Sequence, residues 1–535
     1  MKIGLVGTPA TFNPFLVPNP ETYEITSKLF ATLLDYNYAG QKFNAPADGL
    51  ARSIDALPDG KTFVIHLREA AFSNGIPITA DDVIFSYQMA IDERNESVYG
   101  DLLRIGPEKA PPKFIREDQY TLRVSFPVRY ELVNFIFARV PIVSKGALQE
   151  VAEKGNFREA YGLETPPEKL VCSGPFVLKS YTPDKQIELA YNPHYWKVDS
   201  SGTSLPYVDS VIYFLKTPSE GQSEGFAKKE FHIATLLPKK FKELKDNDTL
   251  DIRDLGVSLS TWGLVLNWRA DPKKIDPYKA TWFRTPGFKW SLLHAVDRDA
   301  IIKEVFDGMA QPALNIISPS NTTWYNPDFK KYEYNLEKAR ETLIKVRYSY
   351  SETGALKDIS GKTVKFTITH LNDTIPTKIA ERLAQDFRKI GMQVDTDPKD
   401  YKTFWKVAST GLYDTLLIKT SPMFPDPAFL QPYMTKRGKY FWFYEPAAVG
   451  ARLVGGAEGW MDGITAKMEE ASQKVLLAER RELYNEAQVT WADKAPIIYL
   501  VSENVLVGAQ KNIGNFKPSV LEPSLTWNIE ELFFK

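Results

Sequence analysis

The length of the chain limits what it can fold into more than any other feature of its sequence. It has 535 residues, whereas a single hydrophobic core rarely grows beyond about 250–300 residues. With 43% hydrophobic and 25% charged residues, the composition is that of a globular protein rather than of a disordered chain. The chain is therefore expected to fold into two or three lobes.

Segments with strand periodicity alternate with segments of helix periodicity. In residues 61–68 (KTFVIHLR) two sets of side chains alternate with a period of two, which predicts a strand. Residues 79–90 predict a helix, with Thr79 as its N-cap and Asp82 at the spacing of a capping box. The amphipathic pattern of residues 288–305 predicts one continuous helix. This alternation favours an α/β fold with mixed sheets.

Charge, cysteine content and motifs argue against several classes of function. Lys plus Arg number 66 and Asp plus Glu 67, so the basic excess typical of nucleic-acid-binding proteins is missing. Cys172 is the single cysteine, and no two of the five histidines have metal-ligand spacing. Neither a disulfide nor a conventional metal site is therefore expected. No nucleophile elbow, phosphate-binding loop or run of about 20 apolar residues occurs.

Aromatic residues are abundant, with 11 Trp, 26 Tyr and 31 Phe. Most of them must lie in the core, but the run at 440–444 (YFWFY) is difficult to bury on both faces at once. An aromatic-lined cleft is one destination for such side chains. Trp324, Trp405 and Trp442 are therefore candidates for either the core or a cleft.

Several phrases, taken in order, match one family. The most specific signature corresponds to residues 59–68 and 72–83 (FSNGIPITADDV). Two later phrases correspond to residues 173–176 (SGPF) and 192–196 (NPHYW), and a helix of the last domain to residues 288–299. The chain thus resembles the family 5 extracellular solute-binding proteins, which serve ABC importers of dipeptides, oligopeptides, nickel and some oligosaccharides.

The resemblance implies a three-domain α/β protein with the type II periplasmic binding protein fold, in which two lobes with mixed β-sheets are joined by a hinge. Domain I is expected at residues 1–43, 170–262 and 501–535, an inserted domain II at 44–169, and domain III at 263–500. Ligand would be enclosed between domains I and III, which close as a trap.

The resemblance also implies a monomer that works outside the inner membrane, periplasmic or extracellular, either free or lipid-anchored. It would deliver its ligand to a membrane permease, need no cofactor and catalyse no reaction. The opening residues hold too short an apolar run for a signal peptide, so we expect that the signal was trimmed from the sequence.

In peptide-binding relatives two segments embrace the ligand, and the resemblance places them near residues 17–21 and 419–426. Counting back from Asp426, the carboxylate that binds the peptide's α-ammonium falls on Met423. An unpaired ammonium buried there would be costly, so Asp426 or Glu21 is the alternative partner. The candidate ligand-binding residues are Asn19, Glu21, Trp405, Thr420, Ser421, Met423, Asp426 and Trp442.

Three kinds of ligand remain open. An oligopeptide comes first, because peptides are the most frequent ligands in the family. The second is an oligosaccharide, for example a β-linked glucan, stacked on tryptophan faces. The third is another small amphiphile or a metal chelate. A glycoside hydrolase with an aromatic cleft is the remote alternative, since its two carboxylates can lie far apart in sequence.

Overall fold

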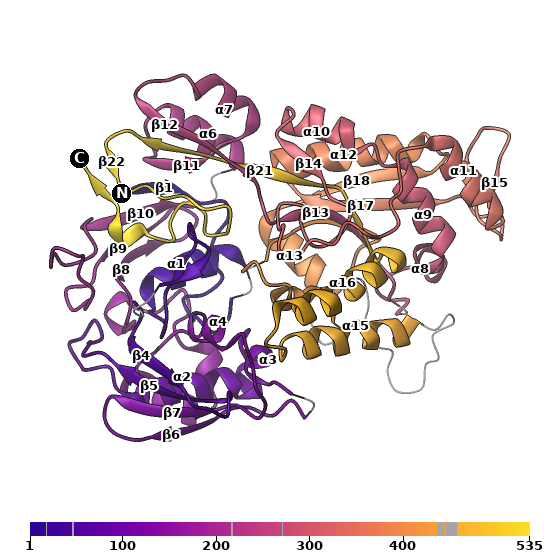
Figure 1. Ribbon diagram of the computed structural model, residues 1–535. Helices are drawn as coiled ribbons and strands as arrows, with labels where there is room; N and C mark the ends of the chain where they lie inside the picture. Colours follow the sequence, from indigo (N-terminus) through magenta and orange to yellow (C-terminus); the bar gives the residue numbers. More distant parts are fainter. Residues whose placement is uncertain are drawn as a thin grey trace.

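Among the described residues, two large clusters form most of the hydrophobic core of the protein, and two small ones complete it. The computed structural model describes residues 1–17, 19–44, 48–106, 108–215, 218–269, 271–422, 424–435, 443 and 457–535. One core cluster takes its buried residues from Trp262 to Val501, and the other from Met1 to Ile233 and Val507 to Leu532, together with Ala428. We call the two bodies the first lobe (residues 1–257 and 501–535) and the second lobe (residues 261–500); they lie side by side in Figure 1.

Three sheets form most of the first lobe, with strand orders β1-β10-β9-β8, β4-β5-β7-β6 and β11-β21-β12. The strands are β1 Lys2–Gly4, β4 Ala51–Ala56, β5 Thr62–Leu67, β6 Lys113–Arg116, β7 Thr121–Ser125, β8 Phe176–Thr182, β9 Gln186–Tyr191, β10 Ser210–Phe214, β11 Ile233–Thr235, β12 Leu250–Val257 and β21 Val501–Gln510. The alternation predicted for residues 61–68 is confirmed, because Phe63, Ile65 and Leu67 are buried while Val64 and His66 between them are half-buried; Thr62 at the start of β5 is buried as well.

Helices cover these sheets. They include α1 Pro20–Leu29, α2 Ala80–Ile91, α4 Val133–Phe137, α5 Lys145–Glu153, α6 Ser219–Ala227 and α7 Pro238–Leu244. The predicted capping box at the start of α2 is confirmed: the Thr79 backbone N–H donates to Asp82 Oδ2 at 2.9 Å, and the Thr79 side chain caps the helix in return.

The second lobe is built on one five-stranded sheet of order β18-β17-β19-β13-β20. Its strands are β13 Thr261–Leu266, β17 Lys365–Leu371, β18 Gln393–Lys399, β19 Thr415–Thr420 and β20 Ile497–Tyr499. Strand β17 pairs in parallel with β18 and β19, while β13 pairs antiparallel with β19 and β20. Every residue of β13 is buried, as expected of a strand covered on both faces. The α/β class with mixed sheets is therefore confirmed.

The helices of the second lobe surround this sheet (Figure 1). They include α8 Pro277–Arg284, α9 Pro286–Ala295, α10 Arg298–Phe306, α11 Leu336–Lys345, α12 Thr374–Arg388, α13 Tyr401–Thr410, α15 Ala457–Ala471 and α16 Leu477–Lys494. The prediction of one continuous helix over residues 288–305 is wrong. The backbone is extended at Val296, and Asp297 caps a new helix by accepting the Ala300 N–H at 2.9 Å. No helix within the described ranges is long and apolar enough to cross a membrane.

The chain passes between the lobes twice, once between β12 and β13 and once between β20 and β21. The two passages lie together, because the Ser258 N–H donates to the Glu503 carbonyl at 2.8 Å and the hydroxyls of Thr261 and Ser502 are 3.3 Å apart. Figure 1 shows β21 running from one lobe toward the other. Such paired connections can act as a hinge. The three-domain boundaries within the lobes stay a prediction.

Candidate functional site between the lobes

The first lobe presents the beginning of α1 to the second lobe. Asn19 is the N-cap of this helix: its side chain accepts the Thr22 N–H at 3.0 Å and donates to the Thr8 carbonyl at 2.9 Å. Pro20 follows at the first helical position, where a missing N–H costs nothing. This cap fixes Glu21 in the first turn, with its side chain buried at 7% exposure.

In the second lobe, the beginning of α13 lies opposite the beginning of α1. The hydroxyl of Tyr401, the first residue of that helix, donates a hydrogen bond to the Glu21 carboxyl across the lobe boundary. The ring of Trp405 lies one turn later, with its centroid 6.2 Å from that of Tyr401. Gly7 packs against the Tyr401 ring. It has a φ of +87°, and a Cβ there would come within 3.1 Å of that ring.

The Glu21 carboxyl has a neutral partner instead of a cation. Burial raises its pKa from the ordinary value of 4.5 to about 8, and the charge of Glu24 acts in the same direction. The Tyr401 hydroxyl opposes this shift only in part, and burial also raises the pKa of Tyr401 itself. The site is therefore an acidic group, buried where the lobes meet, that a cation would stabilise in its ionised form.

This raised pKa predicts how stability depends on pH. Between pH 4.5 and about 8 the folded protein holds the Glu21 proton more tightly than the unfolded chain does. The free energy of unfolding should therefore fall as pH rises through this window, by up to about 1.4 kcal/mol per unit from this group alone. The check is urea unfolding of the wild type and Glu21→Gln at several pH values. The wild type should lose stability relative to the variant as pH rises; a constant difference would contradict the assignment.

A second junction between the lobes is aromatic. Phe424 of the second lobe is fully buried, and its ring centroid lies 4.7 Å from those of Tyr36 and Phe135 in the first lobe. The ring of Phe429 lies 5.1 Å from that of Phe135. Aromatic side chains do gather between the lobes; they are mainly Phe and Tyr residues, and the ring of Trp527 lies at their edge, 6.2 Å from that of Tyr38. The number of tryptophans did not predict this junction. The sequence signal for it was that Phe424 falls inside the segment 419–426.

The rims of the lobes also touch. Ser219, the first residue of α6, donates its hydroxyl to Asp373 before α12. Lys109 forms an ion pair with Glu469 of α15. Lys242 of α7 lies 2.7 Å from Asp307. Together with Glu21 and Tyr401, these contacts describe a closed arrangement of the two bodies.

Two of the candidate residues form hydrogen bonds to the segment where the chain enters the second lobe. The Thr420 hydroxyl donates to the Thr261 carbonyl at 3.1 Å, in the register where β19 pairs with β13. Ser421 accepts a hydrogen bond from the Ser260 hydroxyl at 2.9 Å. Both side chains therefore hold the start of the second lobe in place. Met423 and Trp442 lie outside the described residues.

Asp426 is engaged inside the second lobe. It caps the short 3₁₀ helix Pro427–Leu430 by accepting the Ala428 N–H at 3.0 Å. It also forms an ion pair with Arg480 of α16 and accepts the Tyr484 hydroxyl at 3.1 Å. The ring of Trp324 packs edge-on against Tyr484 within the core. Because the Asp426 carboxylate is already paired with Arg480, it is poorly suited to bind the ammonium group of a ligand as well.

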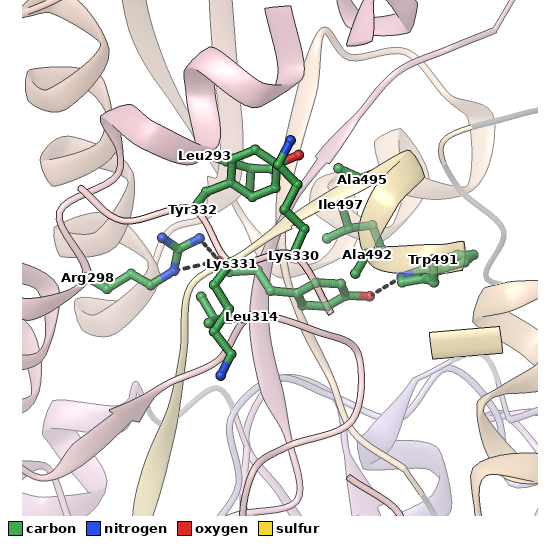
Figure 2. Close-up of a pocket in the computed structure, with 11 residues that line it drawn as sticks. Leu293, Arg298, Leu314, Lys330, Lys331, Tyr332, Trp491, Ala492, Ala495 and Ile497 are labelled. Carbon is green, nitrogen blue, oxygen red and sulfur yellow. Dashed lines mark hydrogen bonds between the residues drawn. The ribbon is translucent and has the colours of Figure 1, made fainter. Parts of the chain in front are cut away.

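A small pocket in the second lobe belongs to its packing. It has a volume of about 20 Å³, which is room for about one water molecule. Figure 2 shows Arg298 and Trp491 on its wall, where Arg298 donates to the Tyr499 carbonyl at 2.7 and 3.1 Å and Trp491 to the Tyr499 hydroxyl at 3.1 Å. In the described part of the chain, no three His, Cys, Asp or Glu side chains are grouped to hold a metal ion.

Known proteins share this fold. The dipeptide-binding protein of Escherichia coli is 24% identical over 539 residues, covering 95% of this chain and 90% of that protein. The oligopeptide-binding protein AppA of Bacillus subtilis, solved with a nonapeptide, has a TM-score of 0.81 at 20% identity and covers 100% of this chain and 98% of its own. The periplasmic binding protein MelB of Agrobacterium fabrum, solved with stachyose, has a TM-score of 0.84 at 20% identity, covering 100% and 84%.

The fold comparison confirms the type II periplasmic binding protein architecture, with its two lobes and mixed sheets. A family model described as "Bacterial extracellular solute-binding proteins, family 5 Middle" matches residues 45–441, which is most of the chain. The resemblance carried by the sequence phrases is thereby confirmed. The chain belongs to the family 5 bacterial extracellular solute-binding proteins.

Proposed function

We propose that the protein captures a short peptide between its lobes and delivers it to the membrane permease of an ABC importer. Proteins similar to it include the Escherichia coli dipeptide-binding protein and AppA of Bacillus subtilis, the latter solved with a nonapeptide. The observation that carries the proposal for this chain is the buried Glu21 carboxyl, which faces Tyr401 across the lobe boundary and has no cation beside it among the described residues.

The α-ammonium group of a peptide fits this carboxyl. Its ordinary pKa is about 7.7–8.0, so it is charged in part or in full at neutral pH. Pairing with it would compensate the buried carboxylate and replace a neutral hydrogen bond with a stronger charge-assisted one. Glu21 thus takes the role that sequence spacing gave to Met423. Asn19 and Trp405, with Tyr401, would form the walls around this group.

As a binding protein of this kind, the chain would act on its own and outside the cell's inner membrane. The ligand leaves the lobes chemically unchanged, and the protein acts as a monomer without a cofactor. It works outside the inner membrane, free or attached through a lipid. The permease receives the closed, loaded form, because only that form presents both lobes in a fixed relation.

The experiment is a thermal-shift screen of free peptides of two to five residues, the same peptides acetylated at the N-terminus, and a set of oligosaccharides. A free peptide at about 100 times its Kd should stabilise the protein by about 2.7 kcal/mol. The acetylated peptides should lose most of this effect, since they carry no ammonium. Stabilisation by sugars alone would replace the peptide assignment with the oligosaccharide one. Mass spectrometry should recover the ligand intact; cleaved product would indicate a hydrolase.

A further inference from the structure

A second cavity lies inside the first lobe. It has a volume of about 330 Å³, which is within the range of about 300–1,000 Å³ found for small-molecule sites. All of its lining residues come from the first lobe, among them Tyr23 and Ser27 of α1, Tyr38, Arg139 and Trp527. It is thus separate from the Glu21–Tyr401 contact, which needs both lobes.

Arg139 is the unusual residue of this cavity. Its side chain is only 4% exposed, and its Nε atom is buried without a hydrogen-bond partner in the described part of the chain. The guanidinium carbon lies 4.1 Å from the centroid of the Tyr23 ring. Among the described residues, no carboxylate lies within ion-pair distance of it. A guanidinium stays charged at any ordinary pH, so this is a buried positive charge that aromatic faces and a hydrogen bond to the neutral Tyr38 hydroxyl compensate only in part.

The other cations on the cavity wall are already paired. Lys28 lies 4.0 Å from Glu24 and donates to the Thr526 carbonyl at 2.9 Å. Lys197 is held by Asp35 at 2.7 Å and Glu530 at 2.6 Å. Lys517 lies 2.9 Å from Glu531. Arg139 is therefore the one cation of the described cavity wall that has no carboxylate within ion-pair distance.

We propose that this cavity binds a carboxylate-bearing small molecule, with Arg139 as the residue that pairs with the carboxylate. A single guanidinium compensates one negative charge, so a monoanion fits better than a dianion such as sulfate, whose second charge would stay buried and unpaired. The planar guanidinium can hold both oxygens of a carboxylate at once. The hydroxyls of Tyr23 and Tyr38 beside it are hydrogen-bonded to each other at 3.3 Å, which leaves one of their two protons to donate to the ligand.

The carboxylate can come from two sources. The ring of Phe424, from the second lobe, lies 5.8 Å from the Arg139 guanidinium, so the cavity ends near the lobe junction. The carboxyl terminus of a captured peptide is therefore one source, and a free small organic acid is the other. The cavity and its cation can bind a carboxylate from either source, whether or not the captured ligand is a peptide.

The first arm of the test titrates the purified full-length protein with sodium propionate, against sodium chloride at equal ionic strength, and follows Tm. Propionate should raise Tm in the wild type, and Arg139→Gln should weaken its binding by about 10–100-fold. The matched control is Arg129→Gln, which removes a half-exposed arginine paired with Glu131 at 2.7 Å and should behave as the wild type does.

The second arm compares a peptide with its C-terminal amide, using a peptide found in the screen. If the site takes the peptide's carboxyl terminus, the amide binds more weakly than the acid in the wild type and equally well in Arg139→Gln. If it takes a free acid, propionate still raises Tm at saturating peptide. Arg139→Lys keeps the charge but loses the bidentate geometry, so intermediate binding supports the site even where the Gln variant fails to fold. Equal responses of wild type and Arg139 variants in both arms would overturn the proposal.

Discussion

Replacing Glu21 with Gln is expected to weaken peptide binding by about 100-fold, because a buried ammonium would be left without its counter-charge. Gln keeps the size of the side chain and can still meet the Tyr401 hydroxyl. The ligand-free variant should therefore be at least as stable as the wild type, by a margin that grows between pH 4.5 and about 8 and stays constant above, because folding of the wild type must keep the carboxyl protonated or bury it ionised. Loss of binding without loss of stability is the expected signature.

Calorimetry in buffers of different ionisation enthalpy makes this prediction sharper. With a pKa of about 8, Glu21 is mostly protonated in the free protein at neutral pH, and an arriving ammonium should expel that proton. Binding to the wild type should release close to one proton per peptide, and binding to Glu21→Gln none. The control is Glu220→Gln, which removes an exposed charge from the same second position of helix α6. Equal affinity and equal proton release in wild type and Glu21→Gln would remove Glu21 from the site.

Replacing Asp426 with Asn is expected to destabilise the second lobe by about 3–5 kcal/mol, because Arg480 would remain as a buried and uncompensated charge. The side chains of Arg480 and Asp426 are only 11% and 6% exposed, so solvent screens the pair little. Urea unfolding should show the loss as a lower midpoint. The double variant Asp426→Asn with Arg480→Met should recover part of it, since both charges are then gone.

The pair Asp251 and Arg253 provides the comparison. It lies on the surface, with side chains 32% and 43% exposed, so Asp251→Asn should cost no more than about 1 kcal/mol. If Asp426→Asn instead abolished peptide binding at unchanged stability, Asp426 would be a ligand residue, and Glu21 would not be the only carboxylate that binds the peptide.

Local sequence patterns were sufficient for the elements and for the family. The alternation at residues 61–68 and the spacing of Thr79 and Asp82 depend on neighbours a few positions away, and both predictions are confirmed. The break at Val296 was missed because the apolar pattern continues through it. Asp297 was visible as a possible cap, but a capping residue inside an apolar pattern gives only a weak signal against continuity.

The candidate site depended on contacts that no local pattern encodes. The family resemblance indicated Asn19 and Glu21, and the aromatic content indicated Trp405. The residue that joins them is Tyr401, whose hydroxyl reaches Glu21 over 380 positions of sequence. Which side chain of a helix's first turn faces the other lobe is decided by how the lobes pack. The same reason applies to Asp426: its spacing was visible, whereas the Arg480 that binds it, 54 positions away, was not.

The position of β21 affects the order in which the protein can be assembled. This strand lies between β11 and β12 and pairs with both, although it comes after the whole second lobe in the chain. During synthesis this sheet must wait, with its middle position vacant, until the second lobe has been made and β21 has left the ribosome. The sheet of β11, β21 and β12 therefore cannot be completed before the second lobe has been synthesised.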